Sequence, residues 1–461
     1  MIKKSFKNIL ETTIGQSNVL TDDVDLYSYA YDGAPENPVM PDIVLTPETT
    51  EDLGKIIGLI NEEKMPTIIR GAGTNLSGGT IPIKKGAVIV TTKLNRILEI
   101  NTNDMYAVVE PGIVTSKFAG AVEKNGLFYP PDPASQNVST MGGNVCENAG
   151  GLRGLKYGVT KDYVMGMEFY DTLGNLIKTG SKTVKCATGL NLSALMVGSE
   201  GTLGVISKII LKLIPKPTFS KAMMVVYNDM LDASESVSAI IANKIVPATL
   251  EFLDNFTIKA VEDYCNIGLP TDAATILLIE VDGNYRSAVE DEAKKVVAIC
   301  EKLNGSVRIA NNLEEKNKLW EARRVALAAL SRVKPTVILE DATVKRSAIP
   351  EMVKTIVDIS KKNNVLIGTF GHAGDGNLHP TILTDKRDKE EMKRVERAID
   401  EIFLKAVELE GTLSGEHGIG IAKARYFKAE VGQSTIEFSN KLKHTFDPNN
   451  ILNPDKFLKV I

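Results

Sequence analysis

Three of the four histidines lie within a stretch of 46 residues, and two of them flank a turn signal. His372 and His379 stand on either side of the pair Asp375-Gly376. An Asp-Gly pair between extended residues predicts a two-residue hairpin turn. Pairing outward from that turn sets His372 opposite His379, with their Cβ atoms roughly 4.5–5.5 Å apart on one face. The spacing therefore predicts two imidazoles that could share one metal ion.

A carboxylate and the third histidine follow in a glycine-rich segment, Ser414-Gly415-Glu416-His417-Gly418. Two histidines and one glutamate form a catalytic rather than a structural metal set, because they leave coordination positions open. The alternative is that these histidines are ordinary hydrogen-bonded turn residues.

The composition is that of an ordinary globular protein. The chain has 461 residues, 43% of them hydrophobic, and a net charge of −4, so it is long enough for two to four domains and does not favour nucleic acid. No apolar run approaches the ~18 residues that would span a bilayer, and no apolar segment follows the basic N-terminus as in a secretory signal. The four cysteines are scattered without a Cys-x-x-Cys pair, which is typical of reduced cytoplasmic thiols and excludes an iron–sulfur site.

Strand and helix patterns alternate along the chain, which predicts an α/β or an α+β fold. Helices are expected at 49–64, 233–243, 285–303, 313–332 and 386–410, and strands at 67–70, 87–91, 106–110, 222–227, 249–253 and 275–281. The segment Lys212-Leu213-Ile214-Pro215-Lys216-Pro217 looks like a boundary. We therefore expect domains at 1–217 and 218–410, followed by a C-terminal segment, 411–461.

A glycine-rich loop follows the expected strand at 67–70 and reads Arg70-Gly71-Ala72-Gly73-Thr74-Asn75-Leu76-Ser77-Gly78-Gly79. Such loops can turn several backbone N–H groups toward one anion. The loop is not a dinucleotide fingerprint, since Leu76 stands where the third glycine belongs, and no Gly-Lys-Ser/Thr follows as in a Walker loop. Taken alone, it could equally be a plain glycine-rich turn.

Further segments accompany this loop in a fixed order. They are Pro130-Pro131-Asp132-Pro133, the run Ser139-Thr140-Met141-Gly142-Gly143-Asn144 continuing to Ala149-Gly150-Gly151, then Lys156-Tyr157-Gly158 and Gly198-Ser199-Glu200-Gly201-Thr202-Leu203-Gly204-Val205. Together they resemble the FAD-binding domain of the vanillyl-alcohol-oxidase superfamily. The branch with the best match holds the glycolate oxidase flavin subunit, D-lactate dehydrogenase and D-2-hydroxyglutarate dehydrogenase. The resemblance implies an FAD-binding domain, an α+β cap domain with an antiparallel sheet, and a C-terminal segment that returns to the first domain and completes the active site.

The resemblance also implies a cofactor site. The first loop and residues 142–144 would hold the pyrophosphate through backbone donors, and residues 200–206 would line the adenosine or ribityl part. The residues assigned to the cofactor are Arg70, Gly71, Ala72, Gly73, Thr74, Asn75, Gly78, Pro131, Asp132, Ser139, Thr140, Gly142, Gly143, Asn144, Ala149, Gly150, Tyr157, Gly158, Glu200, Gly204, Val205, Ile206 and Asn453. Because no histidine precedes His372, we expect non-covalent FAD, with a cysteinyl link from Cys146 or Cys186 as the alternative.

By the same resemblance, His372, His379 and Glu416 would bind a divalent metal, zinc first, with iron or manganese as alternatives. A 2-hydroxy acid would chelate the metal and transfer hydride to flavin N5 while His417 takes the hydroxyl proton; His417 could instead support a ligand or be a fourth one. Arg323, in the Trp-x-x-Arg of Trp320-Glu321-Ala322-Arg323, would hold the substrate carboxylate, unless it forms a surface ion pair. Asn377 would orient substrate, unless it is a left-handed turn residue.

The leading expectation is a D-lactate dehydrogenase, with glycolate and D-2-hydroxyglutarate as the next substrates. Without iron–sulfur cysteines or a nicotinamide fingerprint, the electrons need a partner, of which electron-transfer flavoprotein is the first choice and an iron–sulfur subunit or quinone the next. A metal-dependent hydrolase and a non-catalytic flavin subunit are competing interpretations, and direct reaction with oxygen stays open.

Overall fold

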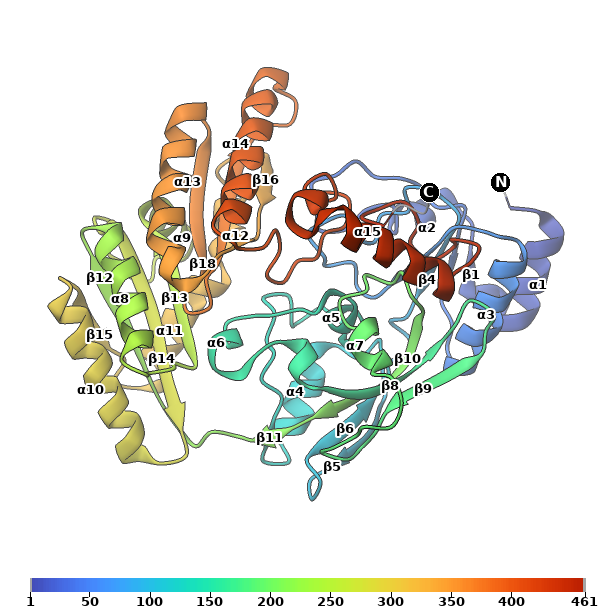
Figure 1. Cartoon of the computed structure of the whole chain (residues 1–461), viewed down its shortest axis with the longest axis horizontal. Coiled ribbons are helices and arrows are strands. Elements are labelled where there is room, and N and C mark those ends of the chain that lie inside the picture. Colours follow the sequence, from blue (N-terminus) through green and yellow to red (C-terminus); the bar gives the residue numbers. More distant parts are fainter. Residues whose placement is uncertain (1, 459–461) are drawn as a thin grey trace. The chain divides into compact units, whose positions relative to one another are not determined.

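The computed structural model describes residues 2–458, and these fall into two compact units (Figure 1). Unit 1 is built from the chain up to Gly150, from Val159–Lys216, and from Glu416 onward. Unit 2 contains Gly151–Gly158 and Pro217–Gly415. The division after Lys216 lies one residue from the expected boundary, whereas 151–158 and 411–415 belong to unit 2. The first of these segments is held there because Lys156 and Tyr157 both bond Asp282.

Unit 1 contains a four-stranded sheet in the order β1-β2-β4-β3, in which β2, β4 and β3 are parallel. Apolar faces of α1 and α3 cover it and form one core with the strands. Thr49 caps α3, since its Oγ1 accepts from the N–H of Asp52 at 3.2 Å. The elements are α1 Lys4–Ile14, η1 Gln16–Asn18, β1 Val19–Leu20, α2 Asp23–Tyr27, β2 Ile43–Leu45, α3 Thr50–Glu62, β3 Thr67–Arg70 and β4 Ala87–Val90.

A second sheet of unit 1 is antiparallel, in the order β5-β6-β10-β8-β9, and packs on α4 and α5 over a core that includes Phe118, Tyr129 and Phe169. Its elements and those that follow are β5 Ile97–Asn101, β6 Tyr106–Val109, α4 Thr115–Glu123, β7 Leu127–Phe128, α5 Met141–Glu147, η2 Thr160–Asp162, β8 Val164–Tyr170, β9 Leu176–Gly180, α7 Leu192–Met196, β10 Val205–Lys212, β11 Ile214–Pro215 and α15 Phe427–Phe446.

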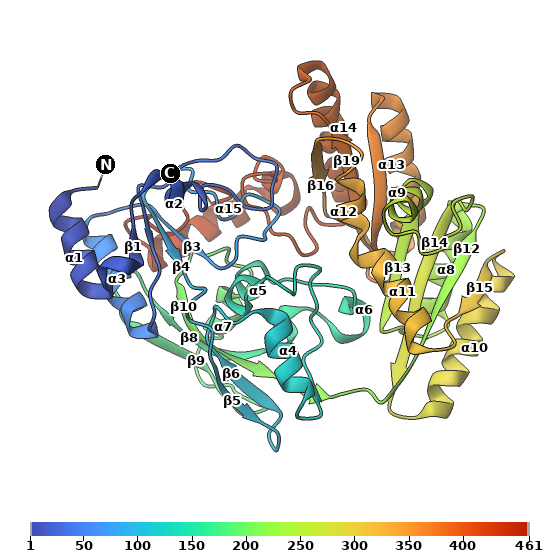
Figure 2. The ribbon, with the colours of Figure 1, turned by 180° about the vertical axis from the view of Figure 1, so that it is seen from behind.

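Unit 2 is an antiparallel sheet in the order β15-β12-β14-β13-β18-β19-β16, with the short β17 paired to β19. Helices α8, α10 and α13 pack on one face and α9, α11 and α12 on the other (Figures 1 and 2). The elements are α6 Gly154–Tyr157, β12 Phe219–Tyr227, α8 Met230–Ala242, β13 Thr249–Asp254, α9 Asn255–Cys265, β14 Thr275–Gly283, α10 Arg286–Lys302, β15 Ser306–Ile309, α11 Leu313–Arg324, α12 Ala326–Leu330, β16 Thr336–Leu339, β17 Ala342–Thr343, η3 Arg346–Ala348, α13 Ile349–Asn363, β18 Leu366–His372, β19 Asn377–Thr384 and α14 Lys389–Glu408.

The expected strands are all present, with ends that shift by up to three residues. One expected helix is wrong: 313–332 is two helices, α11 and α12, which are separated at Val325, where φ is −92° and ψ is −1°. Among residues 2–458, no helix has the length and apolar character needed to cross a membrane.

Candidate active site

The histidine hairpin is formed by β18 and β19, but in a different register from the one predicted. His372 pairs with Asn377 and Phe370 with His379. The two-residue turn is therefore wrong: the turn contains residues 373–376, and the carbonyl of His372 accepts from the N–H groups of both Asp375 and Gly376 at 3.2 Å. A shift of two residues leaves each side chain on its face. The two imidazoles still meet, with ring centroids 5.1 Å apart and planes at 87°.

His372 contacts a buried carboxylate that the sequence did not indicate. Glu251, on β13, is fully buried, and its Oε1 lies 2.7 Å from Nδ1 of His372. Its Oε2 accepts a short hydrogen bond from Nε of Arg323 on α11. The predicted substrate arginine is thus a buried partner of Glu251, and its guanidinium also stacks on the ring of Phe370. The surface ion pair considered for Arg323 is wrong, because its side chain is only 6% exposed.

His379 has a carboxylate neighbour of its own, Asp341, which follows β16. The two side chains are buried, and Nδ1 of His379 lies 3.8 Å from Oδ1 of Asp341. Asp341 accepts from Nδ2 of Asn377 at 2.6 Å and from Oγ of Ser414 at 2.5 Å. Asn377 lies in β19 rather than in a left-handed turn, so that alternative is wrong. Its amide holds Asp341 in place.

These residues of unit 2 suit a divalent metal. The ligand atoms of His372 and His379 lie within 4.8 Å of one another, as do those of Asp341 and His379. Imidazole nitrogens and carboxylate oxygens are ligands of zinc, iron and manganese. A buried carboxylate beside a metal-ligating histidine fixes the orientation of the ring.

Glu416 and His417 open the last segment of unit 1, in a loop that is firmly held there. Nε2 of His417 lies 3.8 Å from Oε1 of Glu416, and the carbonyl of His417 accepts from Oγ of Ser77 at 3.0 Å. The carboxylate of Glu200 accepts hydrogen bonds from two backbone N–H groups of this loop, those of Ile419 at 2.7 Å and Gly420 at 2.8 Å. Glu200 therefore anchors the histidine loop, and its place beside the nucleotide stays a prediction.

The first glycine-rich loop fits an anionic group. Among the described residues, none accepts a hydrogen bond from the backbone N–H groups of positions 71–79. Arg70, the residue before the loop, is fixed by hydrogen bonds from its Nη1 to the carbonyl of Tyr31 at 2.7 Å and to Oγ1 of Thr80, the residue after the loop, at 3.2 Å. Gly73 has φ +69°, and a Cβ there would lie 2.0 Å from Nη2 of Arg70. A half-buried row of backbone donors is what a pyrophosphate requires.

The second glycine motif forms α5, and its donors are already used. The N–H groups of Gly142, Gly143 and Asn144 donate to Pro111 O, Thr140 Oγ1 and Thr140 O. The prediction that these three groups hold the pyrophosphate is thus not supported. The same helix start is tied to α4, since Oγ of Ser139 lies 3.0 Å from Oγ1 of Thr115.

Other residues assigned to the cofactor have structural contacts. Val205 and Ile206 are core residues of β10, and a Cβ at Gly204 would lie 2.8 Å from the ring of Phe169. Asn453 donates from Nδ2 to the carbonyls of Gly79 and Glu200, which ties the C-terminal segment to both loops. Tyr157 and Gly158 belong to unit 2. Pro131 and Asp132 are buried, Ala149 donates its N–H to the carbonyl of Asn144, and a Cβ at Gly150 would lie 2.5 Å from Oε2 of Glu416.

Burial raises the pKa of Glu147 well above its usual value, and the neighbouring charge of Glu200 raises it further. Burial also raises the pKa of Glu200 and lowers that of Lys456 to about 8. Two of these residues lie beside the first loop: Nζ of Lys456 donates to the carbonyl of Gly79, and a Cβ at Gly79 would lie 3.1 Å from Oε1 of Glu147.

Comparison with known proteins decides the family. A family model for the C-terminal domain of FAD linked oxidases matches residues 216–457, and one for an FAD binding domain matches residues 41–180. The chain is 50% identical to the glycolate oxidase subunit GlcD of Bacillus subtilis over 99% of this chain and 97% of that one. The chain belongs to the FAD-linked oxidase family.

Other relatives of this chain include the glycolate oxidase subunit GlcD of Escherichia coli K12, 36% identical over 95% of this chain and 88% of the relative. The D-lactate dehydrogenase of Anaerostipes hadrus is 34% identical over 90% of this chain and 89% of that one. The predicted resemblance is thereby confirmed, and the chain is an FAD-linked oxidoreductase.

Solved structures confirm the fold. p-Cresol methylhydroxylase superposes with a TM-score of 0.80 at 18% identity, covering 99% of this chain and 98% of that one. The 4-ethylphenol oxidase of Gulosibacter chungangensis gives 0.79 at 17% identity, covering 99% and 97%. The chain therefore has the vanillyl-alcohol-oxidase fold that the motifs predicted.

Sequence reasoning missed Glu251 and Asp341, although Glu251 gave a signal. It is the acidic residue in the middle of Thr249–Asp254, a strand buried along its whole length. A charge inside a buried strand needs a partner and often marks a site.

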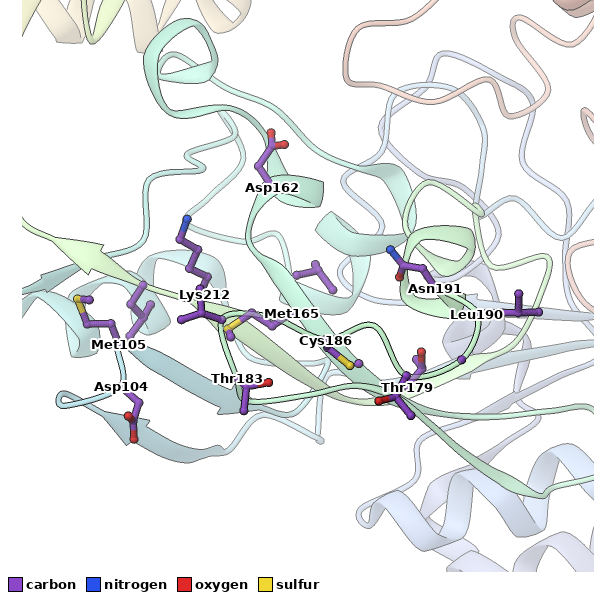
Figure 3. A pocket seen from close by; sticks show the side chains of 16 residues that line it. Asp104, Met105, Asp162, Met165, Thr179, Thr183, Cys186, Leu190, Asn191 and Lys212 are labelled. Carbon is purple, nitrogen blue, oxygen red and sulfur yellow. The ribbon is translucent and has the colours of Figure 1, made fainter.

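A hollow of about 360 Å³ in unit 1 was also not foreseen (Figure 3). Its walls include Asp104, Asp162, Met165, Cys186 and Lys212. Of the cofactor and site residues singled out in the sequence, it is lined only by Cys186, the alternative attachment site for FAD. Its one cysteine, Cys186, is fully exposed to solvent on the segment before α7.

Proposed function

We propose that this protein is an FAD- and divalent-metal-dependent dehydrogenase that oxidises a short D-2-hydroxy acid to the 2-oxo acid. D-lactate is the first substrate to test and glycolate the second. The observation that carries the proposal is the pair of buried histidines on one face of a hairpin, each beside a buried carboxylate. The relatives named glycolate oxidase subunit and D-lactate dehydrogenase support this substrate class.

His372 and His379 are the proposed protein ligands of the metal, with zinc first and iron or manganese as alternatives, and Glu416 is the third. Chain connectivity supports Glu416. A Cβ at Gly415 would lie 2.4 Å from Oγ1 of Thr343 and 2.8 Å from Cγ of Asn377, so the residue before Glu416 is packed at the hairpin. When bound, such a metal lowers the pKa of a coordinated hydroxyl.

The remaining groups would handle the substrate and its proton. His417 is the proposed base that takes the hydroxyl proton. Arg323 is the proposed cation for the substrate carboxylate; since its Nε is bonded to Glu251, its Nη groups are the ones that would bind. Asn377 uses Nδ2 for Asp341 and Thr343, so its proposed contribution is to position the hairpin site.

FAD is proposed to bind non-covalently along the first loop, whose backbone donors have no acceptors among the described residues. When bound, it accepts the substrate's hydride. Burial raises the pKa of Cys146 to about 12, which opposes a thiolate link at that residue. Non-covalent binding predicts that acid precipitation releases all the flavin into the supernatant.

The electrons are proposed to leave through a partner protein, with electron-transfer flavoprotein first and an iron–sulfur subunit next. The word "subunit" in the names of the relatives supports a partner.

The test is the anaerobic visible spectrum before and after addition of D-lactate or glycolate, together with metal analysis. We expect an oxidised flavin band that bleaches, and one metal ion per chain. His372→Ala should keep FAD but lose metal and flavin reduction, whereas His444→Ala, a change at an exposed histidine outside the site, should behave like wild type. Normal reduction of His372→Ala would refute the metal mechanism. A protein without flavin would favour the hydrolase, and steady peroxide release in air would replace the dehydrogenase by an oxidase.

A further inference from the structure

We propose that Glu251 is a positioning residue that fixes the tautomer of His372 and thereby sets the metal affinity of the hairpin site. The inference rests on the proposed function, because it assumes that His372 ligates a metal. It goes further in naming a residue, outside every motif, on which ligation depends.

Three buried groups in a row carry the inference. Glu251 lies between Arg323 and His372, with Oε2 accepting from Arg323 Nε and Oε1 2.7 Å from His372 Nδ1. The three side chains are 0%, 6% and 7% exposed, so water cannot replace any partner. They come from β13, α11 and β18, which join the hairpin to the sheet and to the helix layer.

The charges determine which atom carries the proton. A buried carboxylate is costly without a cation, and Arg323, which is always protonated, provides one. A carboxylate in its ionised form accepts hydrogen bonds and donates none, so the contact with His372 requires a proton on Nδ1. The lone pair then resides on Nε2, and that nitrogen is the metal ligand.

The arrangement at His379 differs. Its Nδ1 lies 3.8 Å from Asp341 Oδ1, beyond hydrogen-bond distance, and Asp341 bonds Asn377 and Ser414. Of these two contacts between a carboxylate and Nδ1, only the one at His372 is within hydrogen-bond distance, so Glu251 is the carboxylate that fixes a tautomer through Nδ1.

The first measurement reads the tautomer itself. The chain has four histidines, so histidine-specific ¹⁵N labelling of the full-length, metal-free flavoprotein gives four ring systems. The signal absent from His372→Ala identifies residue 372. We expect the Nδ1–H tautomer in wild type near neutral pH. An Nε2–H tautomer in wild type would overturn the proposal without recourse to any variant at position 251.

The second measurement is zinc affinity by chelator competition, in Glu251→Gln and in the control Glu280→Gln. A glutamine side chain cannot accept hydrogen bonds from both neighbours. If its oxygen faces His372, its NH₂ group faces the N–H donor of Arg323. If its oxygen faces Arg323, its NH₂ group faces His372, and Nδ1 must then be the acceptor. Loss of such a carboxylate partner typically costs roughly ten- to a hundredfold in metal affinity. Glu280 accepts from Trp320 Nε1 at 2.9 Å on the neighbouring strand, so its substitution matches the chemistry without contacting a histidine.

We expect Glu251→Gln to bind zinc at least tenfold more weakly and to show the Nε2–H tautomer at residue 372, with Glu280→Gln within twofold of wild type. Zinc affinity of Glu251→Gln within twofold of wild type would overturn the inference while leaving the proposed function intact. A wild-type protein that binds no zinc, iron or manganese would instead overturn the proposed metal function, and the two failures are thus distinguishable.

Discussion

The carboxylate of Glu200 accepts a 2.7 Å hydrogen bond from the backbone N–H of Ile419, two residues after His417. Its second oxygen accepts from Gly420. These bonds join the Gly-Ser-Glu-Gly segment of unit 1 to the loop that carries Glu416 and His417. Burial raises the pKa of Glu200, whereas the two N–H donors and the charges of Lys456 and Lys423 lower it. Glu200 thus fixes the backbone that follows His417, the proposed base.

Glu200→Gln should loosen this loop, because a glutamine retains one acceptor oxygen and leaves one buried N–H without a partner. We expect a loss of about 1–3 kcal/mol in stability, faster hydrogen exchange at residues 419–420, and a lower rate of flavin reduction with FAD still bound. Hydrogen exchange followed by mass spectrometry checks this. Glu123→Gln, at a solvent-exposed ion pair with Lys216, should change stability by no more than about 0.5 kcal/mol. Unchanged exchange at 419–420 would contradict the anchoring role.

The sequence predicted which face the two histidines share but not how the hairpin is paired. Faces follow from the two-residue period of a strand, and any slip by two residues preserves them. The register depends on the turn, where Gly376 adopts φ +89° and approaches the carbonyl of Val344 so closely that a Cβ would lie 2.1 Å from it. Val344 directly follows β17, and the local sequence around Asp375-Gly376 does not predict this contact.

The glycine-rich segments predicted the family and the first loop, because close backbone approach requires glycine there. The carboxylate partners of the histidines could not be predicted, since Glu251 and His372 are 121 residues apart in the chain and meet only because β13 pairs with β18. The order of strands in a sheet decides which residues become such neighbours, and the periodicity of a single strand carries no information about that order. The donors of Gly142, Gly143 and Asn144 could not be predicted either, because their acceptors are the carbonyl of Pro111 and the N-cap residue Thr140.

Gly376→Ala should be strongly destabilising, because the new methyl group would meet the Val344 carbonyl in a backbone conformation that L-residues avoid. We expect a loss of about 2–4 kcal/mol, the sum of the left-handed cost and of overpacking, and weaker zinc binding at the hairpin. Urea denaturation measured at constant flavin occupancy gives the stability change.

Gly268→Ala is the matched control for Gly376→Ala. Gly268 has a similar φ of +83°, but a Cβ there would find no atom within 4 Å. Its substitution should therefore cost only the left-handed penalty, about 1–2 kcal/mol. If both variants lost the same free energy of unfolding, the contact with Val344 would not contribute to the effect of Gly376→Ala.

Cys186 should be the first thiol to react with iodoacetamide. It is exposed, and hydrogen bonds from the backbone of Thr188 and from Ser181 lower its pKa, whereas burial raises the pKa of Cys300 and of Cys146. Since the thiolate is the nucleophile, peptide mapping at pH 8 should show Cys186 modified at least tenfold faster than the buried pair Cys146 and Cys300. Cys186→Ser should remove the fast phase. Labelling of Cys146 at a comparable rate would mean that the core under α5 opens readily.

Asp254 should make unit 2 less stable as the pH rises through the weakly acidic range. Its Oδ1 accepts from the N–H of Thr257 at the start of α9, and its Oδ2 accepts from the N–H of Thr369 at 2.7 Å. Burial nevertheless raises its pKa from 3.8 to about 6. Between those values the folded protein binds more protons than the unfolded chain, so this residue's contribution to stability declines as pH increases from about 4 to 6.

The difference between 3.8 and about 6 corresponds to about 3 kcal/mol at about 1.4 kcal/mol per pKa unit. Asp254→Asn removes the titration, so the stability of wild type minus that of the variant should fall by up to this amount between pH 4 and 6 and stay flat above pH 7. Asp358→Asn makes the same charge change at an exposed site of α13 and corrects for net charge. A wild-type-minus-variant difference that rises across the same interval would show that the two N–H donors outweigh burial and hold the carboxylate ionised.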